Sequence, residues 1–133
     1  MADIIAVQVN QISRTAGEGA VRDHSVLIDR PVAKGGENKG AMGGELLLIA
    51  LGGCFMSNLL AAIDSRAAQI SEVRVEIEGD LENSPARFSE VRMRVFANYD
   101  DKALMEKLVT ISERACIVAN TLKQAVSLSI RLD

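Results

Sequence analysis

The stretch from Leu46 to Ile63 reads LLLIALGGCFMSNLLAAI and runs eighteen residues without a charged side chain. An apolar segment of this length meets the threshold for a helix that crosses a membrane. Gly52 and Gly53 interrupt its middle, however, and acidic residues flank it in place of an aromatic belt or a Lys and Arg bias. We therefore predict a buried helix of a soluble protein, with no membrane partner.

A helix that is apolar on every side has to be buried on every side. One small sheet cannot surround a helix, so we predict a homodimer in which this helix packs against its copy and the sheets of both subunits enclose the pair. Gly53 and Ser57 lie four residues apart and form a small-residue face that permits close contact between helices.

The composition fits a single domain that spans residues 1–133, with 48% apolar and 25% charged residues. Aromatic residues make up only 3%, so the core has to be aliphatic. The net charge of −3, without a basic stripe or aromatic platform, argues against nucleic-acid binding. The N-terminal residues do not resemble a signal peptide. We expect a cytoplasmic protein whose two cysteines form no permanent disulfide.

Residue periodicity predicts the secondary structure, because alternation indicates strands and a spacing of three or four indicates helices. The N-terminal part is predicted to contain a strand over 5–9, one or two further strands over 20–29 that close a hairpin or meander, and a Gly-rich loop over 32–44. A helix over 44–68 follows, and then strands over 72–81 and 88–99. The remaining predicted elements are a helix capped by Asp100 or Asp101 that breaks near Cys116, a shorter helix through 126 and a strand over 128–132. On the helix that Asp100 or Asp101 caps, four apolar residues share one face: Leu104, Leu108, Ile111 and Ala115. This order predicts an α+β fold with a mostly antiparallel sheet.

The two cysteines are the candidate reactive residues. Cys54 lies at the centre of the apolar helix beside two glycines, which leave space for a substrate near the sulfur. It is either a small buried apolar residue or a nucleophile. Cys116 lies at the expected helix break, where a thiol can be reached, and two thiols in a reducing compartment suggest a peroxidatic and a resolving cysteine. Two cysteines with His24 and no C-x-x-C pattern are a poor ligand set for a metal.

The segment GGELLLIALGGCFMSNLLAAI, followed by ACIVANTLK, resembles the OsmC/Ohr family of osmotically inducible and organic-hydroperoxide-resistance proteins. The resemblance extends along essentially the whole chain. It implies an intertwined α+β homodimer, with antiparallel sheets wrapped around two long central helices and active sites at the dimer interface. It also implies reduction of organic hydroperoxides, with Cys54 as the attacking and Cys116 as the resolving cysteine. The implied reductant is an external dithiol of the lipoyl type, with no bound cofactor.

A buried thiol stays inert unless a positive charge favours the thiolate. The resemblance implies an arginine from the N-terminal strands for this role, and a glutamate at the start of the central helix that holds the arginine. Arg14 is the first candidate by its distance from the Gly-rich loop, with Arg22 and Arg30 as alternatives. Glu45 is the candidate carboxylate.

The chain departs from the family pattern at two places. Well-characterised hydroperoxide reductases carry Asn-Pro-Glu where this chain has Gly43 and Gly44, so Glu45 is one residue nearer the cysteine. One residue is about 100° of helix rotation, so Glu45 either serves the site or only the positive helix N-terminus. The second cysteine is followed by Ile117, where many peroxidatic members have proline.

Two functional hypotheses follow. The first is a thiol peroxidase in which apolar side chains near the cysteine favour alkyl or fatty-acid hydroperoxides over hydrogen peroxide. The residues expected to line that pocket are Leu51, Phe55 and Met56. The second hypothesis uses the same fold as a non-enzymatic binder of small apolar ligands or as a redox-responsive module, and the two departures motivate it.

Overall fold

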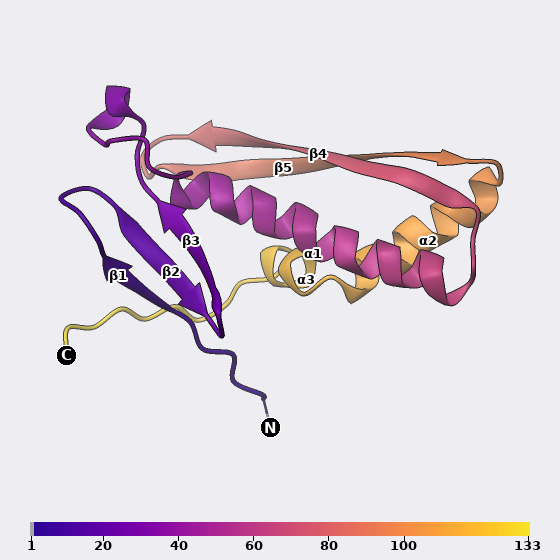
Figure 1. The fold of residues 1–133 in the computed structure, drawn as a ribbon, viewed down its shortest axis with the longest axis horizontal. Coiled ribbons are helices and arrows are strands. Elements are labelled where there is room, and N and C mark those ends of the chain that lie inside the picture. The colour runs from indigo at the N-terminus through magenta and orange to yellow at the C-terminus, as the bar shows by residue number, and fades with distance from the viewer. Residues whose placement is uncertain (1) are drawn as a thin grey trace. The chain divides into compact units, whose positions relative to one another are not determined.

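The computed structural model describes residues 2–133 (Figure 1). The chain divides between Leu47 and Leu48 into an N-terminal and a C-terminal unit, and helix α1 (Gly43–Ser65) runs through the division. Strands pair only with antiparallel neighbours in both sheets of the described residues, and three α-helices accompany them. The predicted α+β class with antiparallel sheets is confirmed.

The N-terminal unit contains a three-stranded sheet in the order β1 (Gln8–Gln11), β2 (Gly17–Val21) and β3 (His24–Ile28), followed by the 3₁₀ helix η1 (Val32–Lys34). The predicted first strand begins later than expected, because residues 5–7 pair with no strand of the described chain. Its expected buried face is also exposed, since Val9 is 61% exposed.

A buried carboxylate organises the Gly-rich loop that follows β3. Asp29, which is 3% exposed, accepts backbone hydrogen bonds from Arg30 at 2.7 Å, Glu37 at 3.1 Å and Lys39 at 3.2 Å. Burial raises the pKa of Asp29, but the hydrogen bonds from these amides and from the Thr15 hydroxyl lower it by more. The pKa of Asp29 therefore falls below its ordinary value. The loop is therefore tied to the end of β3 rather than being a freely flexible crossover.

The C-terminal unit combines the rest of α1 with the antiparallel ribbon of β4 (Ile70–Glu82) and β5 (Arg87–Tyr99), and with helices α2 (Lys102–Ala115) and α3 (Ile117–Leu122). The long ribbon runs beside these helices (Figure 1). Asp101 caps α2 by accepting a hydrogen bond from the amide of Leu104 at 3.0 Å, as its position in the sequence predicts.

The core of this unit lies between α1, α2 and one face of the ribbon. Leu59 and Leu108 are fully buried at its centre, and apolar ribbon side chains pack against the cluster. Gly52 permits the close approach of α1 to β4, since a Cβ there would lie 2.7 Å from Cδ1 of Ile77. The predicted apolar face of α2 is partly right, because Leu104 and Ile111 are half-buried and Ala115 is exposed. Met105 and Ser112 are buried in addition.

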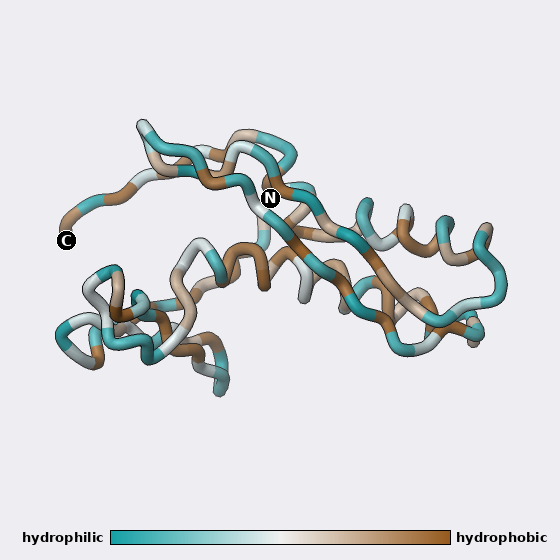
Figure 2. Tube along the Cα trace, turned by 90° about the horizontal axis from the view of Figure 1, so that it is seen from above, coloured by the Kyte–Doolittle hydropathy of each residue, from teal (hydrophilic) through white to brown (hydrophobic). Residues whose placement is uncertain are grey.

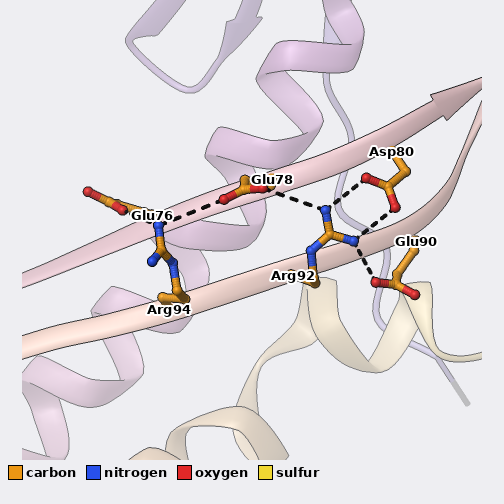
Figure 3. Close-up of polar contacts among 6 residues, drawn as sticks. All are labelled: Glu76, Glu78, Asp80, Glu90, Arg92 and Arg94. Atoms are coloured by element: carbon orange, nitrogen blue, oxygen red, sulfur yellow. Dashed lines mark hydrogen bonds and ion pairs between the residues drawn. The ribbon is translucent and has the colours of Figure 1, made fainter.

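The opposite face of the ribbon carries a network of charged side chains (Figure 3). Arg92 forms two parallel hydrogen bonds to Asp80, at 2.8 and 2.9 Å, and Arg94 pairs with Glu76 at 2.9 Å. All four side chains are more than 40% exposed, so each pair stabilises the fold only weakly. Hydropathy alternates along both strands, so the ribbon has one apolar and one charged face (Figure 2).

The predicted last strand over 128–132 is wrong for the chain by itself. α3 ends at Leu122, short of the predicted 126, and the residues that follow form no strand. Leu128 is 80% and Ile130 is 91% exposed, although the alternation that predicted a strand is plain in the sequence (Figure 2). A strand needs a neighbour to pair its N–H and C=O groups, and this segment pairs with no strand of the described residues.

One side of α1 is also uncovered. Ile49 is 61% and Leu60 is 49% exposed, and Gly53 and Ser57 are exposed between them. α1 is long and apolar enough to cross a membrane, but the core helices of soluble proteins meet the same two criteria. Only 28% of its apolar window is buried within the chain, so this helix has a face that requires cover.

Candidate active site

The two cysteines come together in the C-terminal unit. Cys54 lies on α1, and Cys116 occupies the break between α2 and α3, with φ −76° and ψ 113°. This extended residue ends α2 and caps α3, because its sulfur accepts a hydrogen bond from the amide of Ala119 at 3.4 Å. Cys54 packs against the core cluster that contains Cys116, each thiol affects the pKa of the other, and both cysteines are free. The fold thus joins thiols that are far apart in sequence.

The surroundings separate the acidities of the two thiols. Burial raises the pKa of Cys54, but the amide of Val118, the thiol of Cys116 and the amide of Ile117 hydrogen bond to its thiolate, so the pKa falls below its ordinary value. Burial also raises the pKa of Cys116; the Ala119 amide opposes this, but the neighbouring Cys54 keeps the pKa above its ordinary value. The pair therefore loses its first proton from Cys54 in preference to Cys116.

The two sulfurs also differ in exposure. Cys54 is half-buried, whereas Cys116 is 0% exposed. The expectation that the helix break makes the Cys116 thiol accessible is therefore wrong, because the break itself is present but the sulfur points into the core. A soluble reagent can approach Cys54, and Cys116 is in contact with Cys54 instead of solvent.

Comparison with known proteins identifies the family of the chain. A family model described as OsmC-like protein matches residues 36–131, a range that contains both cysteines. The chain belongs to the OsmC-like family. No curated protein matches this OsmC-like chain.

Solved structures share its fold at low sequence identity. An OsmC-like protein from Mycoplasma pneumoniae has a TM-score of 0.79 at 14% identity, covering 92% of this chain and 89% of that one. An organic hydroperoxide resistance protein from Elizabethkingia anophelis has a TM-score of 0.69 at 19% identity, covering 92% and 91%. An OsmC-like protein of unknown function from Vibrio cholerae has a TM-score of 0.69 at 15% identity, covering 90% and 94%.

The predicted carboxylate of the OsmC-like site has a local role at the start of α1. Glu45 Oε1 accepts a hydrogen bond from the amide of Met42 at 2.8 Å, which is the reciprocal half of a capping box. This geometry matches the second of its two predicted roles, service to the helix N-terminus. Whether Glu45 also acts at the thiol stays a prediction.

The three candidate arginines belong to the N-terminal unit and lie in turns or loops. Arg14 is exposed in the turn between β1 and β2, and Arg22 has a positive φ of 54° in the turn between β2 and β3. Arg30 follows β3 at the start of the loop that Asp29 organises. The arginine that serves the thiol stays a prediction.

The residues of the predicted apolar lining lie on α1, within three residues of Cys54. Leu51 is 8% and Phe55 is 4% exposed, and both belong to the core cluster that Cys54 packs against. Met56 is half-buried. Open grooves of about 440 and 480 Å³ lie elsewhere, one between β5 and α2 and one in the N-terminal unit, and none of the three residues lines either. Their role toward a substrate stays a prediction.

Sequence reasoning missed the backbone amides that lower the pKa of Cys54. Those of Ile117 and Val118 belong to the first turn of α3, six residues long. A signal for one of them is present in the sequence, because a proline at 117 would have no N–H to donate. The departure from the family pattern at Ile117 therefore leaves an N–H group at a position where it lowers the pKa of Cys54.

Proposed function

We propose that this chain is a thiol-dependent peroxidase that reduces organic hydroperoxides through Cys54 and Cys116. The observation that carries the proposal is the direct contact of two free thiols, of which the half-exposed one has the lowered pKa and the buried one the raised pKa. A thiolate is the nucleophile in peroxide reduction, and a second thiol in contact resolves the product.

The reaction has two steps. The Cys54 thiolate attacks the terminal oxygen of the hydroperoxide, the O–O bond breaks, and the alkoxide leaves and takes a proton to become an alcohol. Cys54 is then a sulfenic acid. The Cys116 sulfur attacks it, the S–O bond breaks, and hydroxide leaves with the thiol proton as water, which gives a disulfide. An external dithiol of the lipoyl class then reduces the disulfide by thiol exchange.

The proposal includes a cytoplasmic homodimer in which a second copy covers the exposed side of α1. Leu60 and Ile49 expose apolar surface there, and Gly53 has no neighbour within 4 Å of a Cβ position. The alternating segment from 126 to 132 is also available for pairing with a second copy. Arg14 stabilises the thiolate in this assembly, and Glu45 orients the arginine. Neither nucleic acid nor membrane is a partner.

We expect a preference for alkyl over hydrogen peroxide. In this proposal Leu51, Phe55 and Met56, which lie within three residues of Cys54 on α1, supply an apolar lining for the substrate. Burying about 100 Å² of an alkyl group against such a lining is worth about 2.5 kcal/mol. If the transition state gains this in full, the second-order rate constant for cumene hydroperoxide exceeds that for hydrogen peroxide by about 70-fold. Stopped-flow oxidation of the reduced protein with each peroxide measures the ratio. Equal rate constants, or rates no faster than those of a free thiol, would contradict the proposal.

A second function is favoured by one observation. The carboxylate of Glu45 accepts a hydrogen bond from the amide of Met42 at the N-terminus of α1, so Glu45 already has a structural role that needs no arginine. Under this alternative the fold binds a small apolar ligand or responds to redox state without turnover. Slow oxidation in the stopped-flow experiment, together with saturable binding of an alkyl ligand, would favour it.

A further inference from the structure

The orientation of α3 decides whether its first-turn amides meet Cys54. α3 has six residues, too few to form a stable helix by itself, and it follows an extended residue at which the chain changes direction. Contacts across the break must therefore set its direction relative to α2. Two side chains make such contacts. Asn120 of α3 donates a hydrogen bond to a carbonyl of α2, and Lys123, the C-terminal cap of α3, pairs with the carboxylate of Glu113.

The Asn120 contact is the more directional of the two. Its Nδ2 donates to the carbonyl oxygen of Arg114 at 3.0 Å, six residues back along the chain. Carbonyls in the last turn of a helix have no partner within that helix, so this amide satisfies one of them. The Lys123–Glu113 pair joins two flexible side chains that are each more than half exposed, and such pairs are weak and adjustable.

We infer that Asn120 is a positioning residue, which ties α3 to the end of α2 and so holds the first turn of α3 beside Cys54 and Cys116, where Val118 and Cys54 pack against the same core cluster. The side chain of Asn120 hydrogen bonds to the carbonyl of Arg114 and to neither sulfur, so Asn120 acts on Cys54 only through the backbone of α3. The consequence for peroxide turnover rests on the proposed function, whereas the consequence for the acidity of Cys54 does not.

The chain offers a matched control one residue away. Thr121 Oγ1 donates to the carbonyl oxygen of Ile117 at 2.8 Å, so it makes a side chain to backbone bond of similar quality that stays within α3. Asn120→Ala and Thr121→Ala each remove one such bond, and each replaces a weak helix former by alanine. Only the first variant cuts the link to α2, so a weaker α3 cannot explain a difference between them.

The test is the pH dependence of Cys54 alkylation. Reduced protein is treated with iodoacetamide from pH 5 to 10, and modification of Cys54 is followed by peptide mass spectrometry, with thermal unfolding measured in parallel. Cys116 is the titratable group in contact with Cys54, and the charged groups at the break are Glu113, Arg114 and Lys123, all of which these substitutions keep.

We expect Asn120→Ala to slow alkylation at pH 7 by roughly 3- to 10-fold, because the profile moves to higher pH as the thiolate loses donors. Asn120→Leu, which has nearly the shape of asparagine but no donor, should behave in the same way. Thr121→Ala should leave the profile within about twofold of the unaltered protein. An unshifted profile in Asn120→Ala, or equal shifts in Asn120→Ala and Thr121→Ala, would overturn the inference.

Failure of the proposed function gives a different result. If the protein does not consume peroxide but Asn120→Ala still shifts the alkylation profile, the positioning role stands and the peroxidase proposal falls. If peroxide is consumed rapidly and Asn120→Ala leaves the alkylation profile unchanged, the positioning role falls and the peroxidase proposal stands.

Discussion

Replacing Cys54 by serine is expected to lower the rate of peroxide consumption by on the order of 1,000-fold or more, to the level of buffer. The serine hydroxyl fits the same space on α1, but it stays protonated at neutral pH and is a weak nucleophile without a general base. Stopped-flow mixing with cumene hydroperoxide and end-point peroxide assays measure the loss. The substitution replaces only the sulfur atom by oxygen, so the helix content, measured by far-ultraviolet circular dichroism, should be unchanged.

The control for this prediction is Cys116→Ser. Serine is a good N-cap, so its hydroxyl can replace the sulfur as the acceptor for the amide of Ala119 and α3 should persist. This variant should still consume one equivalent of hydroperoxide and stop at the sulfenic acid of Cys54, which a dimedone adduct detects. If Cys54→Ser keeps the activity, or if Cys116→Ser loses the first oxidation, the proposed roles of the two cysteines are wrong.

Replacing Leu60 by glutamate is expected to dissociate the proposed homodimer. The side chain is 49% exposed on the uncovered side of α1, and the proposed partner helix would bury it. A twofold axis places the substitution in both subunits, so two carboxylates would be desolvated close together. We expect the dissociation constant to rise by at least about 100-fold, equivalent to about 2.7 kcal/mol. Sedimentation velocity over a concentration series measures it.

Leu60→Met is the matched control, because methionine keeps the volume and the apolar character of the site. It should sediment as the unaltered dimer does. A monomeric unaltered protein would contradict the proposed assembly directly. So would a Leu60→Glu variant that remains as tightly associated as Leu60→Met.

The sequence predicted most of the fold because the signals for its elements are local. Alternation along 72–81 and 88–99 marks the ribbon, and Asp101 marks the start of α2. The prediction failed for 128–132, where the alternation is equally clear. Alternation predicts that a segment is able to pair as a strand, but pairing also needs a neighbour, and the sequence does not contain the identity of that neighbour.

The candidate site was predictable only in part. The position of Cys54 on an apolar helix and of Cys116 at a helix break both follow from local sequence. Their contact does not, because it depends on how α1, α2 and α3 pack. The burial of Cys116 and the position of the α3 amides that lower the pKa of Cys54 are likewise results of packing. The role of Glu45 at the helix N-terminus was one of two predicted alternatives. The structure was needed to identify its hydrogen bond with the amide of Met42.

The most direct test of the account is the fate of the two thiols after one equivalent of cumene hydroperoxide. The reduced protein is mixed with the peroxide, quenched with an alkylating reagent, and analysed by thiol titration and non-reducing peptide mapping. The account predicts that free thiols fall from two to none per chain, and that a single peptide pair joins Cys54 to Cys116 of the same chain. Two thiols that survive a tenfold excess of peroxide, or a disulfide that links Cys54 to another molecule, would contradict it.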